Sequence, residues 1–248
     1  MKKIEKTNTK IYIARHGQAE HNADKSTGGM ETPLTEEGRI QIYDTAEVAK
    51  AWDITDIISS DMARCKQSTE ILRSVLEADG QKVNVYYSDL LRERSMGVFA
   101  RQDGREGVSV KNLPHDFDFN PNKYRAETKA EVFRRAGVVA KRIVRMREFG
   151  MLGENVLVMG HGMCNDMLQY CLRQGPEARF DLKEYLQVVG RQANASVVRV
   201  DLARAKLREF GLVYGDEKFR SSAIEKIERE LERIGKKSLE RISESEMN

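Results

Sequence analysis

The chain has 248 residues and contains few of the residues that mark specialised protein classes. Only three cysteines, four prolines and one tryptophan are present, and aromatic residues make up 7% of the sequence. Because the cysteines (Cys65, Cys164 and Cys171) are odd in number and form no CxxC pair, we expect neither a disulfide framework nor a structural zinc site. No apolar run approaches the roughly 18 residues that a membrane-spanning helix requires. This composition excludes collagen-like, low-complexity and transmembrane chains.

The chain also lacks a strong excess of charge of either sign. It has 42 Lys and Arg against 39 Asp and Glu, a net charge of +3 at pH 7. This charge is too small to indicate nucleic acid as a partner. The first residues include lysines but only a short apolar run, which does not fit a secretory signal. Together with three reduced cysteines, this predicts a cytoplasmic protein without a membrane partner.

Short runs rich in β-branched or aromatic residues alternate with longer stretches of helical character. The predicted strands are residues 10–14, 54–59, 83–87, 155–159, 196–201 and 206–213. The predicted helices are residues 35–51, 62–78, 128–149 and 163–173. Such alternation predicts an α/β fold with three layers, in which helices cover both faces of a mostly parallel central sheet.

Two segments depart from this alternation. Residues 98–125 include prolines and a mixed aromatic and acidic run, and we interpret them as a cap inserted into a domain of residues 1–215. A long insertion of this kind is either a lid or a flexible surface loop. Residues 216–248 are about half charged, and their apolar residues recur every three or four positions, which predicts an amphipathic C-terminal helix. This helix either packs on its own domain or forms a contact in a homodimer.

Two of the four histidines have the same setting. His16 and His161 each follow an apolar predicted strand, and each precedes a glycine, Gly17 or Gly162. The carboxyl ends of parallel strands open into the crevice where α/β proteins bind their ligands. A glycine after each imidazole lets a ligand approach the backbone closely. We therefore expect both imidazoles to lie in one crevice.

Charged side chains follow the same strand ends. Arg15 precedes His16, and Arg64 lies in the first turn of the helix after the second strand. A guanidinium presents two N–H donors that match a pair of phosphate oxygens. Glu93 follows the third strand, where negative charge from a bound phosphate would favour a protonated carboxyl that donates to a leaving group. Each residue alone is compatible with an ordinary surface position, whereas the set predicts a phosphate site.

Five motifs, taken in order, resemble the histidine phosphatase superfamily and, within it, the phosphoglycerate-mutase-like branch. They are RHG at 15–17 with Asn22, PLTEEG at 33–38, SSDMAR at 59–64, LRERSMG at 91–97 and VLVMGHG at 156–162. The resemblance extends from about residue 11 to 201, and NASVVRV at 194–200 is similar to the last strand of the family. Ordered motifs over this length are far more specific than RHG alone.

The resemblance implies roles for particular residues. His16 would be the nucleophile that forms a phosphohistidine, while Arg15, Arg64 and a cationic His161 would hold the phosphoryl oxygens. Glu93 would protonate the leaving oxygen. The resemblance implies no metal and no cofactor. It also implies contacts to phosphate or substrate from a second set of residues: Asn22, Thr27, Gly28, Arg94 and Gly162.

The chain departs from the family pattern at several positions. Ala19 replaces a common Ser or Thr, and Met163 replaces the Asp that is typical of the acid-phosphatase branch. The cap lacks the long basic segment of phosphoglycerate mutases, and we interpret Arg134 and Arg135 as ordinary helix surface. The expected function is hydrolysis of a small phosphorylated metabolite through phosphohistidine. The alternatives are a cofactor-dependent phosphoglycerate mutase and a non-catalytic protein that binds a phosphorylated ligand.

Overall fold

The computed structural model describes residues 10–102, 105–175, 179, 185, 192–201 and 212–214, and its centre is a six-stranded sheet. The strand order is β3-β2-β4-β1-β5-β6. The neighbours from β3 to β1 are parallel, whereas β5 is antiparallel to both β1 and β6. This confirms a mostly parallel sheet. The strands are β1 (Lys10–Arg15), β2 (Asp56–Ser60), β3 (Asn84–Ser88), β4 (Asn155–Gly160), β5 (Val197–Asp201) and β6 (Leu212–Tyr214).

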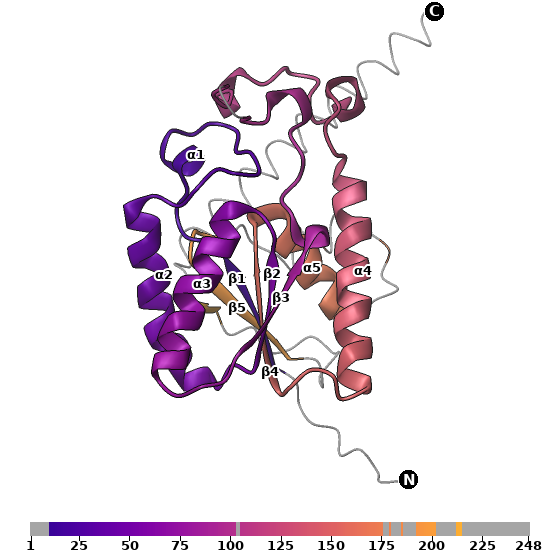
Figure 1. Ribbon diagram of the computed structural model, residues 1–248. Coiled ribbons are helices and arrows are strands. Elements are labelled where there is room, and N and C mark those ends of the chain that lie inside the picture. Colours follow the sequence, from indigo (N-terminus) through magenta and orange to yellow (C-terminus); the bar gives the residue numbers. More distant parts are fainter. Residues whose placement is uncertain are drawn as a thin grey trace, which may run out of the picture.

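Four long helices cover the two faces of the sheet (Figure 1). They are α2 (Glu36–Ala49) and α3 (Ala63–Ala78) on one face, and α4 (Lys129–Glu148) and α5 (Gly162–Gln174) on the other. All four helices occur where the sequence predicts them. Thr35 begins α2 as expected, because its hydroxyl accepts the Gly38 N–H at 3.0 Å and two glutamates occupy the first turn.

The period-two pattern of the strands divides the apolar side chains between two cores. In β1, Ile11 and Ile13 pack toward α4 and α5, whereas Tyr12 and Ala14 pack toward α2 and α3. All of these side chains are buried, as are those of most of β4 beside them. A strand that is covered on both faces requires a continuous apolar run, which the sequence supplies. The two cores hold the carboxyl ends of β1, β2 and β4 in fixed positions.

The cap, residues 98–125, lies over the edge of the sheet where the parallel strands end (Figure 1). The rings of Phe99, Phe117 and Tyr124 pack together with centroids 5.2 to 5.8 Å apart. Thr27 fastens the cap to the loop after α1 (Glu20–Ala23), because its hydroxyl donates to Phe99 O and accepts the Val108 N–H. These hydrogen bonds therefore join the described part of the cap to the rest of the domain.

Two predictions fall wholly or partly outside the described residues. The C-terminal amphipathic helix at 216–248 lies outside them, and so do residues 206–211 of the sixth predicted strand, whose last two residues lie in β6. Across the described ranges, no helix combines the length and the apolar character that crossing a bilayer would require.

Candidate active site

His16 follows the end of β1 and is almost completely buried. Its Nδ1 lies 2.6 Å from the carbonyl oxygen of Gly17. Because a carbonyl only accepts hydrogen bonds, Nδ1 carries the proton of the neutral ring and Nε2 is unprotonated. Burial, followed by the charges of Arg64 and Arg15, holds the pKa of His16 well below its usual value. The ring is therefore neutral and presents a nucleophilic Nε2.

Arg64 lies against that nitrogen from the first turn of α3. Its Nε donates to His16 Nε2 at 3.3 Å, and its Nη1 donates to Gly29 O at 2.8 Å. The side chain is only 2% exposed, so its charge acts in a medium that screens it weakly. Arg64 thus places a buried cation next to the atom that would attack a phosphoryl group.

His161 follows β4 and precedes the first turn of α5. Its ring centroid lies 5.1 Å from that of His16, and its Nε2 lies 2.9 Å from Ser60 Oγ and 3.3 Å from Cys65 Sγ. Burial and then Arg64 hold the pKa of His161 well below its usual value. These surroundings favour the neutral ring, whereas the expected cationic His161 concerns a ring in contact with a phosphoryl group. A phosphate dianion beside the ring would favour the charged form.

Glu93 and Arg15 meet at the start of α5. The Glu93 carboxylate accepts the N–H of Arg94 at 2.9 Å and the N–H of Met163 at 3.2 Å. A Cβ added to Gly162 would lie 3.6 Å from Glu93 Oε2 and 3.7 Å from the guanidinium carbon of Arg15. The glycine therefore keeps the space between these two side chains open. The structure brings the five candidate catalytic side chains to one edge of the sheet.

Gly17 has a different purpose from the one that the sequence suggested. A Cβ at this position would lie 2.2 Å from the carbonyl oxygen of Gly38, in the first turn of α2. Glycine is required here because two backbones pack in contact, and the prediction that Gly17 admits a ligand is wrong. Gly162 is the glycine that faces the open site.

Three predicted ligand-binding residues organise the loop that follows His16. The side-chain oxygen of Asn22, Oδ1, accepts hydrogen bonds from the Ala19 backbone N–H and the Asn194 side chain. The side-chain nitrogen of Asn22, Nδ2, lies 2.9 Å from His21 Nε2. A Cβ at Gly28 would lie 3.0 Å from the His21 ring. The hydroxyl of Thr27 is occupied by the cap, as is its N–H, which donates to Val108 O at 2.9 Å. The Thr27 side chain thus tethers the cap, and its predicted contact to phosphate stays a prediction.

Arg94 is also used to join the cap to the domain. Its Nη1 contacts Asp118 at 2.5 Å, its Nε donates to Glu127 O at 2.7 Å, and its guanidinium lies 5.0 Å from the centre of the Phe117 ring. These contacts join Arg94 to the cap, and its predicted role as a phosphate ligand stays a prediction. The interpretation of Arg135 as ordinary helix surface is wrong, because its side chain is 14% exposed and ion-paired with Glu127, whereas Arg134 is exposed as expected.

Two residues outside the predicted set also contact the site. Ser60 ends the apolar strand β2 and reaches His161, and a polar residue at the end of a buried strand was an available signal. His21 lies with its ring centroid 6.1 Å from that of His16, and burial followed by Arg64 and Arg15 lowers its pKa to about 3. In the part of the chain that the structure describes, no three His, Cys, Asp or Glu side chains gather as a metal site.

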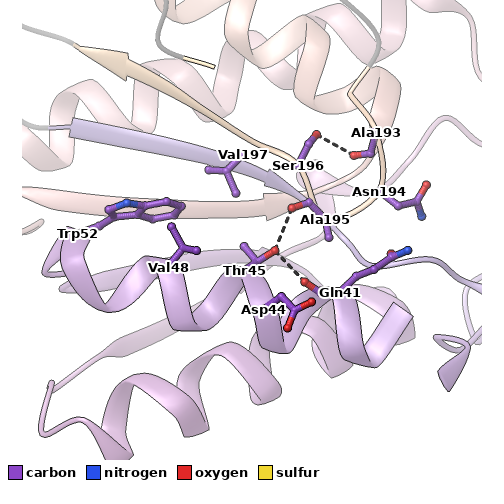
Figure 2. A pocket seen from close by; sticks show the side chains of 10 residues that line it. All are labelled: Gln41, Asp44, Thr45, Val48, Trp52, Ala193, Asn194, Ala195, Ser196 and Val197. Atoms are coloured by element: carbon purple, nitrogen blue, oxygen red, sulfur yellow. Dashed lines mark hydrogen bonds between the residues drawn. The ribbon is translucent and has the colours of Figure 1, made fainter. Parts of the chain in front are cut away.

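A separate cavity of about 250 Å³ lies between α2 and the start of β5 (Figure 2). Figure 2 shows the Thr45 hydroxyl bonded across its floor to the carbonyls of Gln41 and Ala195, with Trp52 at one end. None of the candidate catalytic residues lines it. Its rim is nevertheless joined to the site, because the Ala195 N–H donates to His16 O at 3.0 Å. The cavity wall thus supports the backbone of the candidate nucleophile.

Residues 11–211 match the family model of the histidine phosphatase superfamily (branch 1), and the chain belongs to this superfamily. Among curated relatives, the "probable phosphoglycerate mutase GpmB" of Cronobacter sakazakii is 38% identical over 93 residues. That match covers 37% of this chain and 41% of the relative, so it spans less than half of either protein.

Solved structures share the fold at low identity. A mycobacterial glucosyl-3-phosphoglycerate phosphatase is 22% identical with a TM-score of 0.59, covering 77% of this chain and 90% of that one. YhfR of Bacillus stearothermophilus is 24% identical with a TM-score of 0.61, covering 82% of this chain and 95% of that one. These likenesses establish a histidine phosphatase fold, with helices on both faces of a mostly parallel sheet.

Proposed function

We propose that the protein is a phosphatase that hydrolyses the phosphomonoester of a small metabolite through a phosphohistidine at His16. The observation that carries the proposal is the state of His16. Its Nδ1 is hydrogen-bonded to Gly17 O, its ring is neutral, and its Nε2 is 3.3 Å from a buried arginine. A neutral imidazole with an unprotonated Nε2 is the form that attacks phosphorus.

In the first step, His16 Nε2 attacks phosphorus while the bond to the ester oxygen breaks. Arg15, Arg64 and His161 stabilise the negative charge on the three equatorial oxygens, which is the main contribution a protein makes to phosphoryl transfer. Glu93 donates its proton to the departing oxygen, so that an alcohol leaves and a carboxylate remains. The products are phosphohistidine and the dephosphorylated alcohol.

In the second step, water attacks the phosphohistidine. The Glu93 carboxylate accepts a proton from the water as the oxygen–phosphorus bond forms and the nitrogen–phosphorus bond breaks. Inorganic phosphate leaves, and His16 returns to the neutral form with Nδ1 bonded to Gly17. Dividing the hydrolysis in this way replaces one difficult displacement with two easier ones.

A phosphoglycerate mutase is the second candidate, and it is favoured by the relative that carries that name. A mutase returns the phosphoryl group to its substrate, and phosphoglycerate brings a carboxylate that requires a cation. Arg94, the residue next to Glu93, already pairs with Asp118 of the cap. The cap lacks the long basic segment of phosphoglycerate mutases, which favours the phosphatase over the mutase.

The proposal is tested with His16→Ala and a generic aryl phosphate as substrate. We expect phosphate release to fall by at least about 10³-fold in a protein that stays folded. His115→Ala is the matched control, since His115 is exposed in the cap, and it should retain activity. Full activity of His16→Ala would overturn the proposal. A second assay, with phosphoglycerate and 2,3-bisphosphoglycerate, would instead favour the mutase if isomerisation exceeded phosphate release.

A further inference from the structure

Arg135 lies in the second turn of α4, and its side chain reaches the segment that carries Glu93. Its Nη1 contacts two backbone carbonyls of that segment, Leu90 O at 2.8 Å and Arg92 O at 2.5 Å. The same nitrogen lies 3.4 Å from the sulfur of Cys164, in the first turn of α5. One planar group thus joins α4, the Glu93 segment and the helix turn whose Met163 N–H holds the Glu93 carboxylate.

Glu127 completes the arrangement from the chain that leads into α4. Its carboxylate pairs with Arg135 through two contacts, at 2.7 Å to Nε and 3.0 Å to Nη2. The carboxylate also accepts the Ser95 N–H at 3.2 Å, and the backbone N–H of Glu127 donates to Ser95 O at 3.0 Å. Its backbone carbonyl accepts from Arg94 Nε at 2.7 Å. Glu127 therefore holds the residues directly after Glu93, whereas Arg135 holds those directly before it.

The ion pair is partly buried, with Arg135 14% and Glu127 17% exposed. Two parallel contacts between a guanidinium and a carboxylate fix both groups in one plane, which a lysine cannot reproduce. Carbonyls before Glu93 and an N–H after it are both fixed, so the backbone at Glu93 has little freedom to rotate. A proton donor displaced by about 1 Å loses much of its effect on the rate.

We infer that Arg135 and Glu127 are positioning residues that aim the Glu93 carboxyl at the leaving oxygen. The inference rests on the proposed function, because it assumes that Glu93 is the proton donor. Neither residue touches the substrate, and their influence passes through the backbone of the segment Leu90–Ser95. The ion pair therefore affects protonation of the leaving group and does not affect the attack by His16.

The experiment compares a poor leaving group, a phosphate ester of a simple alkanol, with a good one, p-nitrophenyl phosphate. Glu93→Gln defines the expected signature, a loss of about 10²-fold or more on the alkyl ester and a much smaller loss on the aryl ester. We expect Arg135→Lys and Glu127→Gln to show the same selective loss at about 10-fold. Arg134→Ala, one residue away and exposed, is the matched control and should change neither rate by more than about 2-fold.

A double variant separates positioning from a general structural role. In the Glu93→Gln background, Arg135→Lys should cause no further selective loss on the alkyl ester, because the proton donor is already absent. Equal losses on both esters, an additive loss in the double variant or no loss at all would overturn the inference. If Glu93→Gln itself shows no leaving-group dependence, the assigned proton donor is wrong, which is a failure of the proposed function. Arg135→Ala is avoided because it leaves Glu127 without its buried partner.

Discussion

The Nε2 of His16 accepts the N–H of Arg64 Nε at 3.3 Å, and both side chains are almost completely buried. The contact places a permanent cation beside a neutral ring nitrogen, so protonation of that nitrogen is strongly disfavoured. The same cation is available for the oxygens of a phosphoryl group. This contact thus meets two requirements of phosphoryl transfer, an unprotonated nucleophilic nitrogen and a fixed positive charge.

The stability of the protein should fall as the solution is acidified below pH 6.5, because His21 is neutral when folded and titrates normally when unfolded. Its pKa is lowered to about 3, so between pH 7.5 and 5.5 only the unfolded chain gains a proton at this residue. Protonation of His21 in the unfolded chain alone lowers the free energy of unfolding by about 1.4 kcal/mol between these pH values. Urea denaturation at the two pH values should show a loss smaller by about that amount in His21→Asn. An identical loss in both proteins would contradict the assigned cause.

Gly17→Ala should destabilise the protein, since the added Cβ would lie 2.2 Å from the backbone oxygen of Gly38. We expect a loss of about 2–3 kcal/mol in the free energy of unfolding. Gly137→Ala is the control, because Gly137 lies inside α4 with 3.8 Å to its nearest neighbour, and it should stabilise by about 0.5–1 kcal/mol. Chemical denaturation measures both, and similar stabilities for the two variants would refute the backbone contact at Gly17.

Ser60→Ala should weaken catalysis without changing the fold. The hydroxyl lies 2.9 Å from His161 Nε2, and removing it leaves that nitrogen with the weaker hydrogen-bonding group of the Cys65 thiol at 3.3 Å. Loss of this hydrogen bond predicts a decrease of about 10-fold in kcat/KM for p-nitrophenyl phosphate. Ser60→Thr keeps the hydroxyl and should retain more activity, while Ser74→Ala on the exposed surface of α3 should have no effect. Wild-type kinetics in Ser60→Ala would disprove this role.

Thr27→Val should loosen the cap, because valine keeps the shape of threonine but loses the bonds to Phe99 O and Val108 N. The partly buried backbone groups left without this partner predict a cost of about 1–3 kcal/mol and faster proteolysis within residues 98–125. Thr27→Ser keeps the hydroxyl and should resist proteolysis as the natural protein does. Equal proteolysis of all three proteins would show that Thr27 does not tether the cap.

The sequence predicted the sheet, its covering helices and the group of catalytic candidates because these depend on local patterns. Short β-branched and aromatic runs indicate strands, and longer stretches of helical character indicate the helices between them. Residues at the carboxyl ends of neighbouring parallel strands lie at the same edge of the sheet. For this reason the sequence alone predicts that Arg15, Arg64 and His161 lie in one crevice.

Other features depended on contacts between distant segments, which no local pattern encodes. The purpose of Gly17 depends on Gly38, that of Thr27 on the cap, and that of Arg135 on the carbonyls of Leu90 and Arg92. A charged pair in a helix is usually solvated, and only the structure distinguishes Arg135 from its exposed neighbour Arg134. The neutral state of His161 likewise follows from burial next to Arg64.

The covalent intermediate is the central claim, and trapping it is the most direct test. The protein would be mixed with p-nitrophenyl phosphate, denatured in alkali within the first turnover and digested for mass spectrometry. We predict one phosphoryl group on the peptide that contains His16, stable in alkali and lost in acid, and none in His16→Ala. A protein that releases phosphate at full rate while His16 stays unmodified at every quench time would contradict the account.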